Sequence, residues 1–326
     1  MRSITRRTAS FGLALAASVT LLSTASAQTW PSRPVKFVVP LGPGSGADIS
    51  ARLIAERLSK KWGQPVIIEN RPGAEGVIAI NAVLNARDDH MLLFGPSSSY
   101  VGHPYTLEKV PYDQKDLKPI ARVSSTLVSV GVTPKLNVST LKELFDLARA
   151  NPGQYNWTTI TGVTDIIVGG FVKKAGLDMV RLRYRDPVTA VTDVAEGRVH
   201  LYVAAFAISR GPAEAGRVKL IAMTNRERAP VRPDLPTVAE AGFPEMSFDG
   251  NVGVFGPPNV PIDLRERIAA DVKEVLSDAE VVKRLEATGQ LIRPGGAAEF
   301  AAAIEDQAAK LGEQAALLGI KKAGGQ

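Results

Sequence analysis

Hydrophobic runs alternate with amphipathic segments along the first third of the chain. The apolar run at residues 35–39 has the length of a buried strand, and apolar positions recur at helical spacing over residues 48–62. Asp48 stands where a helix N-cap belongs, and Gly63 stands where a helix ends. This pattern predicts a strand, a glycine-rich loop and a helix.

The same alternation repeats twice more. We expect a strand at 64–69, a helix at 76–86 and a third strand at 90–95, which opens into the sequence PSSSY. A strand–helix–strand order of this kind implies parallel strands joined by helical crossovers. The first part of the chain is therefore predicted to be an α/β unit.

A second alternating unit follows, reached by a strand at 126–134 and left by a strand at 250–258. Its predicted helices and strands lie at 140–153, 155–160, 165–175, 179–184, 187–196, 199–206 and 218–224. Two helical segments, 262–289 and 297–319, close the chain. Two α/β units with two crossings favour a two-lobed protein that closes by hinge motion at the crossings; the alternative is one continuous sheet. We expect residues 30–130 plus 252–326 in the first lobe and residues 131–251 in the second.

The first 27 residues have the features of a secretory signal. Arg2, Arg6 and Arg7 precede an apolar stretch, and small residues then lead to Ala27, where we expect cleavage. A buried N-terminal helix is the alternative. The arginine pair loosely matches a twin-arginine signal, but the general export route fits better. We therefore expect a soluble protein in the periplasm.

Composition excludes several functional classes. The chain has no cysteine, which rules out disulfides, thiolate catalysis and cysteine–metal sites. With 45% apolar and 22% charged residues it can bury a real core. The formal net charge is +6, but three of the positive charges lie in the signal and the rest form no basic block. We expect no nucleic-acid partner and a weak bias towards small anions.

The first glycine loop fits a dinucleotide motif. Gly42, Gly44 and Ala47 match G-x-G-x-x-G/A, and Glu69 follows at the usual distance. Pro43 removes an amide from the loop, however, and nicotinamide cofactors are scarce outside the cytoplasm. We therefore expect no cofactor.

The three glycine- or serine-rich loops at 40–48, 70–76 and 95–100 favour an anion. Glycine lets the main chain approach a ligand, and free N–H groups at a helix start stabilise negative charge. Because the carboxyl ends of adjacent parallel strands meet at one crevice, these loops should converge there. Ordinary strand–helix turns remain the alternative for any single loop. The arrangement suits a carboxylate.

Catalytic and metal-binding patterns are missing from the sequence. Histidines lack metal-ligand spacing, Ser45 lacks the glycines of a nucleophile elbow, and no acid has an evident catalytic mate. The residues concerned are His90, His103, His200, Ser45, Asp165, Asp186 and Asp193. We predict neither an enzyme nor a metalloprotein.

An ordered set of motifs resembles a known family. The set begins with WPSRPVKFVVP and the glycine loop with Asp48 and Arg52. GQPVIIENRPGAEG, VPYDQKDLKPIARV, LPTVAEAGFP and VGVFGPPNVP then follow in the same order. In this ordered set of motifs the chain is similar to the extracytoplasmic solute-binding proteins of tripartite tricarboxylate transporters, the Bug family. The resemblance extends over essentially the whole mature chain.

The resemblance implies a two-lobed periplasmic-binding-protein-like fold of type II, with the ligand cleft between the lobes. Such a protein captures a small organic acid and delivers it to membrane permease subunits, and we expect a monomer. One carboxylate would be held by backbone amides and bridging waters, while the second lobe selects the rest of the ligand. The expected ligand-binding residues are Leu41, Gly44, Ser45, Gly46, Asp48, Gly73, Ala74, Glu75, Gly76, Ser97, Ser98, Thr159, Thr164, Arg185, Ala204 and Ala205.

Several of these positions depart from the family pattern. Leu41 replaces a common aromatic residue, and Glu75 stands where a small residue is usual and would repel an anion unless it points outward. Ala204 and Ala205 replace an acidic residue and its polar neighbour, which favours a ligand without an amino group and with an apolar middle or far end. Arg185 would meet a second carboxylate or lie in solvent.

Two other functional classes remain open. A sensory protein that binds the same acid and reports to a membrane kinase would have the same sequence features. A secreted enzyme on this fold is the third possibility, although no base or nucleophile is evident. Aliphatic diacids, aromatic acids and hydroxy acids all stay possible ligands.

Overall fold

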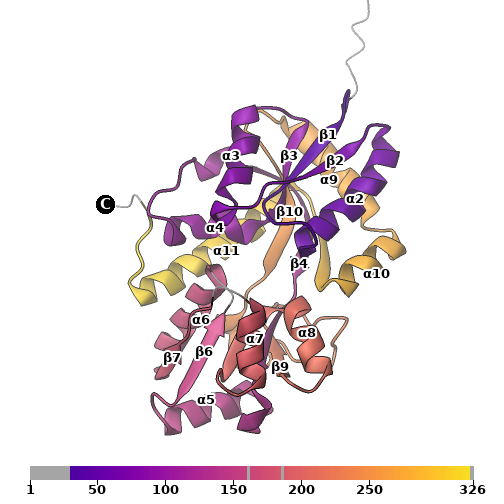
Figure 1. Cartoon of the computed structure of the whole chain (residues 1–326). Helices are drawn as coiled ribbons and strands as arrows, with labels where there is room; N and C mark the ends of the chain where they lie inside the picture. Colours follow the sequence, from indigo (N-terminus) through magenta and orange to yellow (C-terminus); the bar gives the residue numbers. More distant parts are fainter. Residues whose placement is uncertain (1–29, 160–161, 185–186, 324–326) are drawn as a thin grey trace, which may run out of the picture.

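The computed structural model describes residues 30–159, 162–184 and 187–323. It contains two β-sheets, each covered by helices, and Figure 1 shows them one above the other. The expected signal peptide at 1–27 and Arg185 lie outside the described residues.

The upper sheet has the strand order β11-β4-β10-β3-β1-β2. Strand β1 lies between β2 and β3 and pairs in parallel with both, which confirms the predicted strand–helix alternation. Strands β10, β4 and β11 continue the sheet in antiparallel pairs. The bounds are β1 (Val35–Val39), β2 (Val66–Asn70), β3 (Met91–Pro96), β4 (Lys118–Thr126), β10 (Gly250–Gly256) and β11 (Gln290–Gly295).

Both faces of the upper sheet are buried. Side chains alternate along β1, so Phe37 and Val39 join one core while Val38 joins the other. The first core is closed by α2 (Gly46–Trp62), α9 (Ile262–Val275) and α10 (Ala279–Ala287). The second is closed by α3 (Val77–Ala86), α4 (Ser97–Thr106) and α11 (Ala297–Leu318). Burial on both faces explains the continuous apolar run of this strand.

The lower sheet has the order β7-β6-β8-β5-β9. Here too the residues of β8 alternate, with Val203 facing one core and Tyr202 the other. Its strands are β5 (Val128–Val132), β6 (Tyr155–Thr159), β7 (Met179–Arg181), β8 (Leu201–Ala205) and β9 (Lys219–Met223). Its helices are α5 (Leu141–Ala150), α6 (Val163–Lys174), α7 (Pro187–Ala195) and α8 (Phe206–Glu214).

The chain passes between the sheets at two places. It leaves the upper sheet at Thr126 and enters the lower one at Val128, and it returns where β10 begins at Gly250. The expected lobe boundaries, 130/131 and 251/252, fall inside β5 and β10, and the exact residues of each lobe stay a prediction. A third link is α11, which packs along α6 (Figure 1).

Some predicted elements differ from the structure. Helix α2 begins at Gly46, and its N-cap is Ser45, whose hydroxyl accepts a hydrogen bond from the Asp48 amide, so Asp48 is not the cap. The segment after β3, expected as a loop, forms α4, and the helical segment 262–289 is divided by a turn that ends at the N-cap Asp278 and is followed by β11. Short 3₁₀ turns lie at η1 (Ala74–Gly76), η2 (Gln114–Asp116), η3 (Pro134–Leu136) and η4 (Pro244–Met246).

Among the described residues, no helix combines the length and the apolar character needed to cross a bilayer.

Candidate ligand-binding pocket

A pocket of about 360 Å³ lies between the two sheets. Its upper wall comes from three segments that follow β1, β2 and β3, at residues 40–42, 72–76 and 98–106. Residues 162–164, at the start of α6, form the lower wall. The three strand-end loops therefore meet, as their parallel order predicts.

The expected ligand-binding residues divide into two groups. Six of them line this pocket: Leu41, Gly73, Glu75, Gly76, Ser98 and Thr164. The other described members do not line it and stay predictions: Gly44, Ser45, Gly46, Asp48, Ala74, Ser97, Thr159, Ala204 and Ala205.

Asp48 is turned into the protein and away from the pocket. The residue is only 2% exposed, and its carboxylate accepts hydrogen bonds from the Gly44 amide (2.9 Å), Arg52 (2.9 and 3.0 Å) and Asn70 (2.8 Å). Burial raises the pKa of Asp48, but these hydrogen bonds outweigh it and hold the pKa below its usual value. Asn70 also donates to the Leu41 carbonyl at 3.0 Å. Asp48 thus fixes the shape of the glycine loop.

The turn from Gly73 to Gly76 has an unusual backbone. All four residues have positive φ, with values of 121° at Gly73, 45° at Ala74, 55° at Glu75 and 99° at Gly76. A Cβ atom on Gly76 would lie 3.3 Å from the Cβ of Pro40, so glycine here lets two loops approach closely. Ala74 and Glu75 adopt the left-handed conformation without being glycine, which costs roughly 1–2 kcal/mol each.

Adjacent serines at the start of α4 face different surroundings. Ser97 is fully buried, and its hydroxyl donates to Gln307 of α11 at 2.6 Å. Ser98 and Ser99 line the pocket. Both lie in the first turn of α4, where N–H groups have no acceptor within the helix.

The lower wall of the pocket is formed by the start of a helix, α6. Gly162, with φ of 61°, is the N-cap of α6, and Thr164 lies in its first turn. Thr159 is buried and donates to Asp165 at 3.3 Å. The N-termini of α4 and α6 therefore reach one pocket from opposite sides, and each helix start has a partial positive charge.

The two alanines in place of an acidic pair contribute to the packing of the lower sheet. Ala204 is buried in its core, and Ala205 is the N-cap residue of α8. Neither residue lines the pocket, and their assignment as ligand-binding residues stays a prediction.

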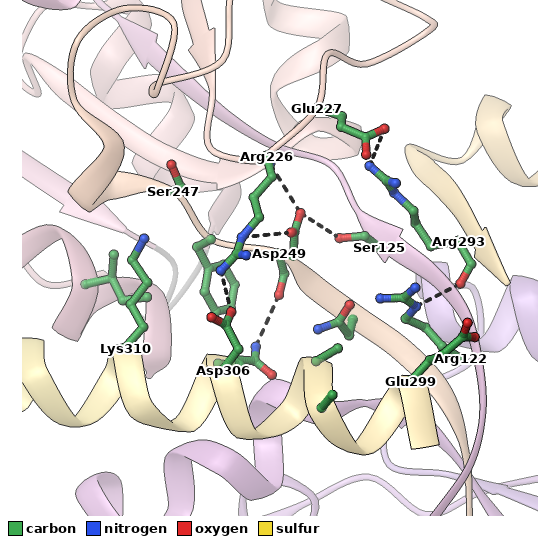
Figure 2. A pocket seen from close by; sticks show the side chains of 16 residues that line it. Arg122, Ser125, Arg226, Glu227, Ser247, Asp249, Arg293, Glu299, Asp306 and Lys310 are labelled. Atoms are coloured by element: carbon green, nitrogen blue, oxygen red, sulfur yellow. Dashed lines mark hydrogen bonds and ion pairs between the residues drawn. The ribbon is translucent and has the colours of Figure 1, made fainter. Parts of the chain in front are cut away.

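A second pocket, of about 400 Å³, lies where α11 meets the crossing strands (Figure 2). Arg226 pairs with Asp306 of α11, and Glu227 accepts from Arg293 of β11 at 2.5 Å. Both ion pairs join the segment after β9 to the upper unit. Exposed pairs of this kind contribute at most about 1 kcal/mol each. No sequence motif pointed to this charged junction.

The three histidines have separate structural surroundings. Asp88, Asp89 and His90 lie close enough to hold a metal ion, but both ring nitrogens of His90 are engaged. Its Nε2 lies 3.2 Å from the Ser32 amide and its Nδ1 lies 2.6 Å from the Asp89 carboxylate. His103 and His200 hydrogen bond elsewhere, to Glu75 and Asn156 respectively.

Two α/β units that are joined by two crossing strands and share a pocket define the fold of periplasmic solute-binding proteins. A solved structure described as a periplasmic transporter is 29% identical and has a TM-score of 0.73, covering 90% of this chain and 99% of that one. R. palustris Rpa4515 with adipate is 27% identical, with a TM-score of 0.76 and the same coverage. MatC (Rpa3494) from Rhodopseudomonas palustris with bound malate is 25% identical, with a TM-score of 0.70, covering 87% and 99%. The expected two-lobed fold is confirmed.

Sequence comparison identifies the family within this class. The profile of the tripartite tricarboxylate transporter family receptor matches residues 50–319. A UPF0065 protein of Bordetella bronchiseptica is 32% identical over 285 residues, which cover 87% of this chain and 85% of that protein. BugT of Bordetella pertussis is 28% identical, covering 88% and 89%. The chain therefore belongs to the tripartite tricarboxylate transporter receptor family.

Proposed function

We propose that this protein captures a small organic acid between its two lobes and delivers it to a membrane permease of the tripartite tricarboxylate type. The observation that carries the proposal is the shared pocket, to which the N-termini of α4 and α6 point and which the strand-end loops surround. Two related proteins bind carboxylates, adipate in one and malate in the other.

The pocket suits a carboxylate because of its backbone. Ser98 and Ser99 offer N–H groups at the start of α4, and the hydroxyls of Ser98 and Thr164 offer further hydrogen bonds. Gly42 and Gly76 leave room for the ligand to approach the main chain. Helix dipoles and amides of this kind stabilise an anion without a positively charged side chain.

Capture requires the lobes to close. A ligand in this pocket touches both units, so it binds more tightly when they approach each other, and this difference in affinity drives closure. The two crossings, near Leu127 and Asp249, are the segments that would absorb the rotation.

The remaining features agree with a receptor of this kind. Residues 1–27 would direct export and be removed after Ala27, leaving a monomer in the periplasm. The ligand would be released unchanged to the permease, because the proposed mode of binding uses no reactive side chain.

A thermal-shift screen of organic acids tests the proposal. A ligand at one hundred times its dissociation constant stabilises the folded state by about 2.7 kcal/mol, which shifts the melting temperature measurably. We expect a carboxylate to produce this shift and neutral sugars to produce none. Stabilisation by sugars or amines alone, or chemical conversion of a bound acid, would contradict the proposal.

Delivery to a permease needs a separate test in cells. Uptake of the labelled acid identified in the screen should fall when the gene for this chain is deleted, and it should return with the wild-type gene. Unchanged uptake would favour a sensory role over transport.

A further inference from the structure

The pocket contains a carboxylate of its own. Among the described residues that line it, Glu75 alone has an ionisable side chain. Glu75 is exposed, and it lies in the turn that precedes α3. The proposed anion-binding pocket therefore presents a negative charge to its ligand.

Helix α4 fixes the position of Glu75 by two hydrogen bonds. Thr106 donates its hydroxyl to Oε2 of Glu75 at 2.8 Å, and His103 lies with Nε2 3.1 Å from the Glu75 carbonyl. A carbonyl can only accept, so the His103 proton is on Nε2, and Nδ1 accepts from the Tyr112 hydroxyl. His103 is fully buried, which lowers its pKa and favours the neutral form of the ring. The carboxylate is thus held in place from the main chain and from the side chain.

The backbone conformation of Glu75 indicates a functional role for this residue. Its φ of 55° is a conformation that glycine adopts freely and that other residues adopt only at a cost. Strained residues of this type concentrate at binding and catalytic sites. A glutamate at this position, in contact with the pocket, points to recognition of the ligand by its carboxylate.

A carboxylate has strict requirements for a partner. It only accepts hydrogen bonds, and Thr106 satisfies one of its roughly four acceptor positions. A ligand made only of carboxylates and methylenes would bring a second negative charge beside Glu75 and leave the remaining positions unpaired once water is excluded. A ligand with a hydroxyl or an ammonium group would donate to them.

We propose that Glu75 is a specificity-determining residue that selects organic acids carrying a hydrogen-bond donor, a hydroxyl or an ammonium group, beside the bound carboxylate. This inference rests on the proposed function. It differs from the expectation, drawn from Ala204 and Ala205, of a ligand without an amino group; neither alanine lines the pocket, whereas Glu75 does.

Calorimetry with three matched ligand series tests the inference. Each series keeps one carbon skeleton: propionate, lactate and alanine; succinate, malate and aspartate; glutarate, 2-hydroxyglutarate and glutamate. In the series that binds, we expect the wild-type protein to bind a donor-bearing acid at least tenfold more tightly than the parent acid. The hydroxy and amino members show which donor is used.

Two variants assign the preference to Glu75. Glu75→Gly removes the acceptor and keeps a residue suited to positive φ, so the ratio between donor-bearing and parent acids should fall to about one. Glu75→Gln should reduce an ammonium preference more than a hydroxyl preference, because the amide oxygen accepts hydrogen bonds but has no charge. Glu108→Gln is the control, since Glu108 is an exposed acid near the end of α4 that does not line the pocket.

The outcomes separate this inference from the proposed function. Equal binding of parent and donor-bearing acids by the wild type, or a preference that survives Glu75→Gly, refutes the role of Glu75 alone. Failure of every acid to bind the wild type, in this panel and in the wider screen, refutes the proposed function and this inference together.

Discussion

Two neighbouring serines show how one residue step changes the role of a side chain. Ser97 is the first residue of α4, and its buried hydroxyl meets Gln307 of α11. Ser98 follows it in the chain and lines the pocket. On a helix, consecutive residues point about 100° apart, so one of them reaches the core while the next reaches the ligand.

Substitution of each serine by alanine should separate stability from binding. Ser97→Ala leaves the Gln307 oxygen buried without its donor, and we expect the free energy of unfolding to fall by about 1–3 kcal/mol with little change in ligand affinity. Ser98→Ala should change stability by less than about 0.5 kcal/mol and weaken ligand binding. Urea denaturation and calorimetry measure the two effects, and the reverse pattern would contradict this assignment of the two hydroxyls.

At the residue scale, the sequence indicates the type of site more readily than the direction of each side chain. The glycine and serine types predicted an anion site, and Leu41, Ser98 and Thr164 do line the pocket. The direction of each side chain depends on where its helix begins. Because α4 begins at Ser97, the hydroxyl of that residue faces the core, which the sequence PSSSY does not reveal.

At the scale of elements, the glycine loop is held to α2 and β2 by one buried carboxylate. Asp48 accepts from Gly44, Arg52 and Asn70, so the loop, the helix and the strand share a hydrogen-bond network. Burial of Asp48 favours its neutral form, but the hydrogen bonds favour the ionised form more strongly, and its pKa is lowered.

This network predicts a contribution to acid sensitivity. A carboxyl whose pKa is lower in the folded state stabilises the protein above its unfolded pKa of about 3.9, and the contribution is lost as the pH falls through the folded value. Asp48→Asn should cost about 2 kcal/mol at pH 7 and flatten the fall in stability below pH 4. Unfolding free energies measured from pH 7 to pH 2 test this prediction. If stability falls below pH 4 as steeply in the variant as in the wild type, the prediction is contradicted.

The elements that the sequence predicted are those with a clear hydrophobic period. Strand β1 and helix α5, in which Leu141, Leu144, Phe145 and Ala148 are buried, are examples. Helix α4 was missed because Ser97 to Thr106 includes three serines, a glycine and Pro104, and only tertiary contacts of residues such as Tyr100 and Val101 hold it against the core. Strands β4 and β11 pair only across large sequence separations, which local patterns do not encode.

At the scale of the whole molecule, α6 connects the pocket to the long helix of the other unit. Thr164 in its first turn lines the pocket, and Gly170 further along is buried against Gln314 of α11. A rotation of the lower unit therefore moves α6 relative to α11 as well as relative to the ligand. The relative position of the lobes is set at this helix contact as well as at the two crossing strands.

A methyl group at Gly170 should disturb this contact. An added Cβ would lie 2.3 Å from Oε1 of Gln314 and 3.0 Å from its backbone oxygen, so the helices must move apart. We expect Gly170→Ala to lower the free energy of unfolding by about 1–3 kcal/mol, as overpacking does. The control is Gly211→Ala in the exposed part of α8, where nothing lies within 4 Å and the change should stabilise by about 0.5–1 kcal/mol. If denaturant titration shows both variants to be stabilised, α11 is not packed against α6 in solution and the helix does not link the two lobes.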